Sequence, residues 1–285
     1  MRRLIQPGPA PPERVVARAG KVEAVDFALA PGQSLNAALT GPLVMAGFRS
    51  GAVVFEGAVL APFRYYLPGP SADGAHAAWF AGPHEAAFAR VETANATFGW
   101  RDGAPYVHCH AVWIEPDGTR RGGHIIPEDS EVRDAGAARA WALRDVRVGA
   151  AYDAESNFIL FAPESGPEAA GLIVVRIRPN EDLCTAIEAL CRARGITTAV
   201  IRGSLGSLVG ARFTDGSDVA DHATEVLIRR GVVREVGGAP HAEIALIVAD
   251  MRGRVHEGVP VRGENAVCIT FELFLEPTPP GKSSA

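Results

Sequence analysis

Three histidines lie close together in residues 106–132, YVHCHAVWIEPDGTRRGGHIIPEDSEV. His108 and His110 alternate with Cys109, and all three lead into the apolar residues 111–114. Because a β-strand has a side-chain period of two, both histidines face one side of the predicted strand and Cys109 faces the other. We therefore interpret Cys109 as a core residue and the two imidazoles as a candidate ligand pair.

The third histidine, His124, follows a predicted turn at residues 116–118 and a Gly-Gly pair that permits close backbone approach. If the two apolar runs pair as a hairpin, His124 returns to the face that carries His108 and His110. Three neutral imidazoles on a rigid sheet suit a divalent metal, with zinc favoured, and leave its fourth position open. An HxH pair alone is weak evidence, because most strand histidines are hydrogen-bonded or half-exposed. The third histidine makes the metal site the preferred interpretation.

A catalytic metal needs an acid or a base nearby. Glu56 and Glu92 are the candidate catalytic residues, because each lies beside a predicted strand in the same half of the chain. The alternative, in which both are solvated surface carboxylates, is favoured for each.

Composition limits the classes of protein that the chain can represent. It has 285 residues, of which 47% are apolar and 21% are charged, which fits one large or two ordinary globular domains. The net charge of −5 provides no basic field for nucleic acid, so DNA binding is disfavoured. The four cysteines are scattered, which is typical of a reducing compartment. No signal-like apolar stretch follows the two N-terminal arginines, and no apolar run is long enough to span a bilayer. These features predict a cytoplasmic protein without a membrane span.

Short strands with Gly and Pro punctuation dominate the first half, and a small helix from residue 34 is expected to break at Gly41-Pro42. In the second half, residues 172–178 predict a strand, followed by a helix that Asn180 or Asp182 could cap and that ends at Gly195. The predicted strands of the first half are residues 22–29, 52–55, 58–60, 64–67 and 94–100, and residues 77–80 form a further apolar segment.

The two halves repeat each other. Aligning Gly118 with Gly253 also matches Gly123 to Gly258 without a gap. In this alignment His108 falls on Glu243, His110 on Ala245 and His124 on Val259, so the second copy has lost the three histidines. Because each copy spans roughly half of the chain, the repeat indicates tandem domains rather than a solenoid.

Both halves resemble the PPC (plants and prokaryotes conserved) domain. The second half carries the resemblance in RPNEDLCTAIEALCRARGITTAVIRGSLGSL, TEVLIRRG, AEIALIVAD and EGVPVRGENAV, and the first half in VHCHAVWIEPDGTRRGGHI. The chain lacks the Arg-Gly-Arg-Pro of an AT-hook, and its first copy reads EGAVLAP in place of GSLGSL. The GSLGSL segment has a phosphate-loop-like glycine spacing, but no GKS or GKT follows, so a strand bulge is preferred.

The resemblance implies an α+β fold with two tandem PPC-like domains, each a mainly antiparallel sheet packed with one or two helices. It also implies a trimer and a metal on the histidines that match the family motif, His108, His110 and His124. Glu225 matches a glutamate of the family, for which a structural or hydrogen-bonding role is preferred. The expected domains are a lead-in at 1–20, the first domain at 21–147, a connecting segment at 148–171, the second domain at 172–277 and a tail at 278–285.

Two functions stay open from the sequence. The first is a zinc-dependent enzyme, hydrolytic or lyase-like, that acts on a small molecule. The second is a non-catalytic regulatory or DNA-binding PPC protein in which the metal is structural. The expected partners are a small-molecule ligand or substrate and further copies of the chain in a homo-oligomer, with a trimer favoured.

Overall fold

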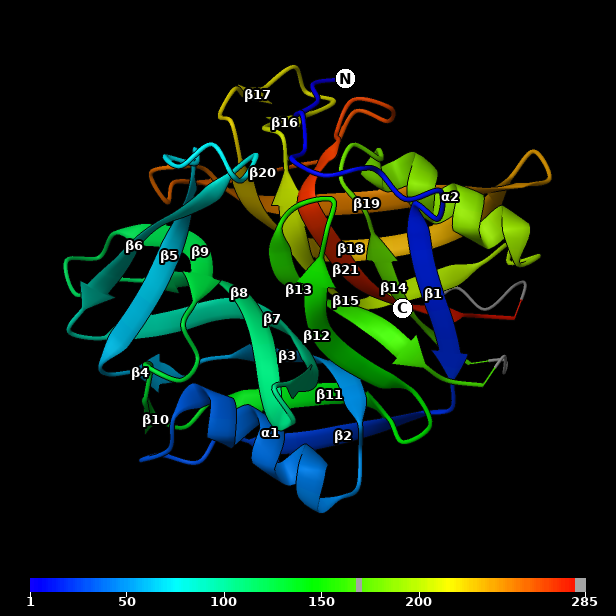
Figure 1. The fold of residues 1–285 in the computed structure, drawn as a ribbon. Helices are drawn as coiled ribbons and strands as arrows, with labels where there is room; N and C mark the ends of the chain where they lie inside the picture. The colour runs from blue at the N-terminus through cyan, green and yellow to red at the C-terminus, as the bar shows by residue number, and fades with distance from the viewer. Residues whose placement is uncertain (168–170, 280–285) are drawn as a thin grey trace.

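The computed structural model describes residues 1–167 and 171–279, so residues 168–170 of the expected connecting segment and 280–285 of the expected tail lie outside it. Two mainly antiparallel sheets, each with one helix, form the fold, as the sequence predicts (Figure 1). Neither helix in the described part of the chain is long and apolar enough to cross a bilayer.

The first sheet contains 12 strands and packs against α1 (Leu35–Met45). Its main path has the order β2-β11-β3-β7-β8-β9-β5-β6. The strands of this path are β2 (Val22–Ala28), β3 (Ser50–Glu56), β5 (Phe63–Gly69), β6 (Trp79–Ala86), β7 (Ala89–Arg101), β8 (Ala104–Ile114), β9 (Arg120–Ile125) and β11 (Ala137–Leu143). The strands outside the path are β4 (Val59–Leu60), β10 (Val132–Asp134), β12 (Arg147–Asp153) and β13 (Phe158–Ser165).

The second sheet contains seven strands in the order β1-β14-β21-β15-β18-β19-β20 and packs against α2 (Leu183–Ala193). Its strands are β1 (Val15–Gly20), β14 (Leu172–Ile177), β15 (Ala199–Leu208), β18 (Thr224–Val236), β19 (Ala239–Ala249), β20 (Val255–Gly258) and β21 (Val267–Pro277). A small separate ribbon pairs β16 (Ala211–Arg212) with β17 (Asp218–Val219).

The internal repeat is visible in the topology. The order β2-β11-β3-β7-β8-β9 of the first sheet recurs as β14-β21-β15-β18-β19-β20 in the second, and in each copy the helix follows the first of these strands. Strands β7 and β18 both have 13 residues and begin at 89 and 224, while β8 and β19 both have 11 residues and begin at 104 and 239. In both pairs, the first residues of the two strands are separated by the same number of residues as Gly118 and Gly253.

Several strands lie outside the repeated order, among them β10 and the β16–β17 ribbon. Strand β1, within the lead-in, pairs with β14 of the second sheet. Strands β4–β6 are inserted between β3 and β7, and the hairpin β12–β13 occupies most of the segment between the domains. The hairpins β5–β6 and β12–β13 therefore have no counterpart in the second copy.

The helix α1 does not break at Gly41-Pro42, contrary to the prediction, and it continues to Met45. Pro42 removes one intrahelical hydrogen bond, which costs roughly 3 kcal/mol in a helix interior. Leu35, Leu39 and Leu43 are fully buried, and each contributes about 1.5–3 kcal/mol by leaving water. Burial on this face therefore outweighs the local preference of proline.

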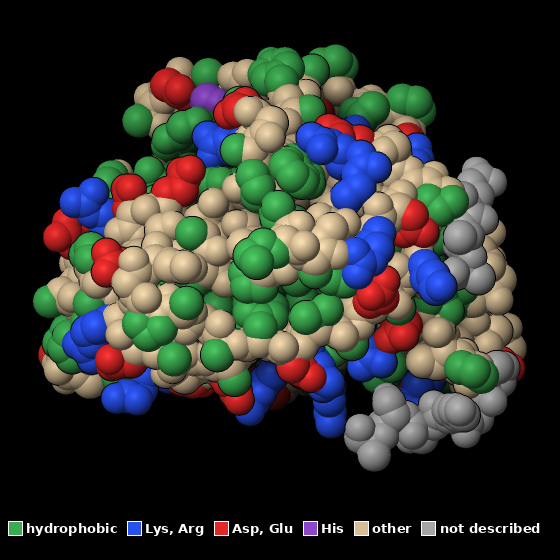
Figure 2. All heavy atoms as spheres, turned by 90° about the horizontal axis from the view of Figure 1, so that it is seen from below, with side chains coloured by type: hydrophobic (Ala, Val, Ile, Leu, Met, Phe, Trp, Pro, Cys, Tyr) green, Lys and Arg blue, Asp and Glu red, His purple; other side chains and the backbone are tan. Residues whose placement is uncertain are grey.

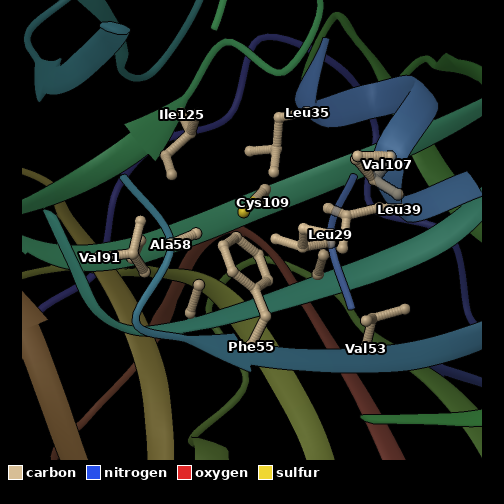
Figure 3. Packing of buried hydrophobic residues seen from close by; sticks show 14 of the residues in the cluster. Leu29, Leu35, Leu39, Val53, Phe55, Ala58, Val91, Val107, Cys109 and Ile125 are labelled. Atoms are coloured by element: carbon tan, nitrogen blue, oxygen red, sulfur yellow. The ribbon is translucent and has the colours of Figure 1, made fainter. Parts of the chain in front are cut away.

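Each sheet has its own apolar core. In the first domain, Phe55 of β3, Cys109 of β8 and Leu39 of α1 point into one cluster (Figure 3). In the second, Ile187 of α2 packs with Phe271 and neighbouring side chains of the sheet. Cys109 is thus a core thiol, as predicted, and burial raises its pKa above the ordinary value.

The two domains are packed tightly at β15. A Cβ atom on Gly203 would lie 2.7 Å from the Cβ of Ala52 in the first domain, so only glycine fits without a shift. Strand β15 also has two register irregularities against β21, between Ile201 and Gly203 and between Gly206 and Leu208, at the start and the end of the GSLGSL segment. These irregularities agree with the interpretation of the segment as a strand bulge. The close approach of Gly203 to Ala52 places this bulge at the boundary between the domains.

The equivalent helix caps of the two domains allow a matched test of stability. Asp182 caps α2 by accepting hydrogen bonds from the amides of Thr185 and the buried Asn265, both at 2.9 Å. Ser34 caps α1 with one acceptor contact to the amide of Ala37 at 3.2 Å. We expect Asp182→Ala to lower the free energy of unfolding by about 2–4 kcal/mol and Ser34→Ala by about 1 kcal/mol, measured by urea denaturation. Equal losses of unfolding free energy in the two variants would contradict a stabilising contribution from the hydrogen bond between Asp182 and the amide of Asn265.

Candidate metal centre

The predicted hairpin forms and brings the three histidines together. His110 of β8 is the direct pairing partner of His124 of β9, and His108 lies two residues away on the same face of β8. The ring centroids are 4.8 Å apart for His108 and His110, 5.0 Å for His108 and His124, and 5.3 Å for His110 and His124. One potential ligand atom from each ring lies within 4.8 Å of the others.

The Gly-Gly pair before His124 is required by close packing on both sides. A Cβ atom on Gly123 would lie 2.8 Å from the carbonyl oxygen of Tyr66, and one on Gly122 would lie 3.0 Å from the Cβ of Ala249 in the second domain. The amide of Gly122 also donates to the carbonyl of Gly253 at 3.0 Å. The glycines therefore let β9 lie between the neighbouring strand β5 and the second domain.

The second domain sets the tautomers of two imidazoles. Nδ1 of His108 lies 3.0 Å from Oε1 of Glu272, and Nδ1 of His110 lies 3.2 Å from the carbonyl oxygen of Val226. A carbonyl or a carboxylate can only accept, so both Nδ1 atoms carry the hydrogen and both Nε2 atoms present lone pairs. A carboxylate or carbonyl behind each imidazole is the usual support of a metal-binding histidine.

The Nε2 atoms of His108 and His110 face each other at 3.1 Å. Lone pairs at this distance repel unless a proton or a cation lies between them. Zinc–nitrogen bonds of about 2.0–2.1 Å in a tetrahedral site separate two ligand nitrogens by about 3.4 Å, which is close to the observed spacing. Nδ1 of His124 is buried and has no hydrogen-bond partner in residues 1–167 and 171–279. The donor set therefore fits a divalent metal.

Burial keeps these imidazoles in the form that binds metals. Desolvation lowers the pKa of His110 and of His124 well below the ordinary value, and the neighbouring His108 lowers both further. Both rings are consequently neutral near pH 7, and neutral imidazole is the metal ligand.

Glu225 of β18 reaches the triad from the second domain. Its Oε2 lies 3.1 Å from Nε2 of His110, and burial raises the pKa of its carboxyl to about 8. This position agrees with the hydrogen-bonding role preferred from the sequence, but no sequence pattern indicates that the partner is a histidine of the other domain. Glu272 was not identified from the sequence at all, because no local motif marks it.

The structure does not bring Glu56 and Glu92 to the histidines. Neither lines the cavity at the triad. Glu56 is exposed at the end of β3, and Glu92 binds Arg120 through both carboxylate oxygens at 2.7 Å. The nearby carboxylates are Glu225 and Glu272 instead, because the acid partners come across the domain boundary and not from the strands beside the histidines.

The triad faces a cavity of about 740 Å³ between the domains. This volume lies within the roughly 300–1,000 Å³ typical of small-molecule sites. Its lining combines the polar side chains around the triad with aromatic rings from the two hairpins that lie outside the repeat. The aromatic residues that line it are Tyr66, Trp79, Phe80, Tyr106, Tyr152, Phe158 and Phe161.

Comparison with known proteins identifies the fold of the second domain. Residues 165–279 match the model of the Plants and Prokaryotes Conserved (PCC) domain, the family that the sequence resembles. The second half of the chain is therefore similar to this domain, and the first half repeats the same strand order. No curated protein matches the chain.

Two solved structures are similar to about half of the chain. A metal-containing protein from Archaeoglobus fulgidus has 16% identity and a TM-score of 0.41, and the match covers 52% of this chain and 98% of that one. A plant- and prokaryote-conserved protein from Pyrococcus horikoshii has 14% identity and a TM-score of 0.39, and the match covers 50% of this chain and 94% of that one.

Metal content tests the triad directly. We expect the protein, purified without added metal, to carry about one equivalent of divalent metal per chain, measured by plasma mass spectrometry. His124→Ala should lose this metal, because two imidazoles alone hold it weakly. His256→Ala, which removes a histidine of the second domain paired with Asp250, should keep it. Two equivalents in the wild-type protein, or loss in both variants, would contradict a single site on the first domain.

Proposed function

We propose that the chain is a metal-dependent enzyme, hydrolytic or lyase-like, with zinc held by His108, His110 and His124. The observation that carries this proposal is that the triad opens into a cavity of about 740 Å³ and is not sealed in the core. Structural zinc sites have four protein ligands and are closed, whereas catalytic sites leave one position for water or substrate.

Each residue at the site has a role that follows from its position. Glu272 and the carbonyl of Val226 orient His108 and His110 by accepting from their Nδ1 atoms. Zinc bound there would polarise a substrate carbonyl or activate a water molecule. The Glu225 carboxyl lines the cavity beside His110, where it can take a proton from water or deliver one to a leaving group. The aromatic walls give the cavity beside the triad an apolar surface.

Turnover of model substrates tests this function. A panel of esters, lactones, amides and hydroxy acids, followed by NMR, should contain members that the protein cleaves. Cleavage should disappear in His124→Ala and fall by about 100-fold or more in Glu225→Gln, which should retain its metal. The matched control Glu243→Gln changes a carboxylate of the second domain that pairs with Arg234, and it should leave turnover unchanged. Equal turnover after metal removal would contradict a metal-dependent reaction.

A structural metal in a non-catalytic regulatory protein is the second candidate. The observation that favours it is that the supports of the triad cross the domain boundary, so a metal would also hold the two domains together. Under this function, chelation should lower the unfolding temperature, measured by calorimetry, and no member of the panel should be cleaved. Metal-dependent cleavage would exclude it.

The second candidate function includes direct DNA binding, which the charge of the chain disfavours. The net charge is −5, and basic and acidic side chains are interspersed on the face shown in Figure 2, without a continuous basic stripe. A homotrimer with a small-molecule ligand stays a prediction from the family resemblance.

A further inference from the structure

The two hairpins outside the repeat line much of the cavity with aromatic rings. Hairpin β5–β6 contributes Trp79 and Phe80, and hairpin β12–β13 contributes Phe158. The ring of Phe80 lies 5.2 Å from that of His124, and the rings of Trp79 and Phe158 lie 4.8 Å apart. These distances are typical of contacting aromatic rings. The aromatic wall is therefore continuous from the two hairpins to the third imidazole, and it offers flat apolar surfaces to a ring-bearing ligand.

Arg101 is the only lysine or arginine among the described residues that line this cavity. Its guanidinium carbon lies 5.1 Å from the centre of the Tyr106 ring, at the end of β7 where the strand turns into β8. The exposed Asp102 is its only carboxylate neighbour within 4 Å in the described chain, and at 3.8 Å it is too distant for a hydrogen bond. Glu225 and Glu272 already contact imidazoles. The charge of Arg101 therefore has no close carboxylate partner at the cavity.

The surroundings of Arg101 favour a carboxylate over a phosphate. Phosphate sites combine several cationic side chains with the amides at a helix N-terminus. All the cavity residues come from strands and the loops between them, and none belongs to α1 or α2. A single guanidinium matches one singly charged carboxylate, which it can bind through two parallel hydrogen bonds.

We propose that the cavity binds an aromatic carboxylic acid or a derivative of one, with its ring against the walls of the two hairpins and its carboxylate on Arg101. This inference deepens the proposed function, because it names the substrate class of the same site. Arg101 is then a specificity-determining residue, and the two inserted hairpins select the apolar part of the substrate.

Calorimetric titration of the chelated, metal-free protein tests the proposal without any reaction. The probes are 2-naphthoate and its neutral analogue 2-naphthamide, because they share a ring and differ in charge. We expect wild-type protein to bind 2-naphthoate more tightly, and Arg101→Gln to weaken that binding by about 10- to 100-fold with little effect on 2-naphthamide. Arg90→Gln, on the same strand but outside the cavity, should bind both probes as wild type does. Phe158→Ala should weaken both probes.

Several results would overturn the proposal. They are the absence of 2-naphthoate binding to wild-type protein at millimolar concentration, equal affinity of wild type and Arg101→Gln for 2-naphthoate, and tighter binding of phenyl phosphate than of benzoate. Because the titration uses metal-free protein, its outcome is independent of the metal content and turnover that test the enzymatic function. Circular dichroism spectra of the variants that match wild type would establish that they are folded.

Discussion

The site depends on one electrostatic constraint, the approach of two imidazole lone pairs. His108 and His110 present their Nε2 atoms to each other at 3.1 Å, and acceptors behind each ring fix both Nδ1 atoms as donors. The rings cannot relieve the repulsion by exchanging tautomers, because Glu272 and Val226 would then lose their hydrogen bonds. A proton or a metal ion between the rings would relieve it, and a metal ion there would also engage His124, whose buried Nδ1 has no partner in the described chain.

This constraint gives the second domain a role despite its loss of the histidines. Its Glu243, Ala245 and Val259 occupy the positions of the triad in the ungapped alignment, so the three imidazoles are missing there. Its Glu225 and Glu272 instead reach the imidazoles of the first domain. The two repeats have thus diverged into complementary halves, one with the three imidazoles and the other with the groups that orient two of them. Neither half holds a complete site, so the packing of the domains and the integrity of the centre are coupled.

The sequence predicts the parts of this arrangement that follow from local patterns. The alternation at His108 and His110, the turn before the Gly-Gly pair and the ungapped repeat lead to the hairpin, the triad and the tandem fold. The continuation of α1 through Pro42 was missed, since burial of a leucine face overrides a local rule. The prediction also places the acid–base carboxylates wrongly at Glu56 and Glu92, because Glu272, which contacts His108, lies 164 residues from it in the chain. Such a pairing depends on how two sheets pack, which no local spacing encodes.

The parts of the cavity inside and outside the repeat differ in how much a substitution would disturb the fold. The triad and its acceptors belong to strands that hold the sheets and the domain boundary together, so substitutions there affect the fold as well as the site. The hairpins β5–β6 and β12–β13 lie outside the repeated order, and three apolar side chains of this cavity wall, Trp79, Tyr152 and Ile159, remain 42%, 66% and 56% exposed. Exposed apolar groups at the wall of a cavity stabilise the folded chain little, because they stay in contact with water. Their position is consistent with the ligand contact proposed for this wall, because loops and hairpins added to a scaffold are where a fold acquires new binding properties.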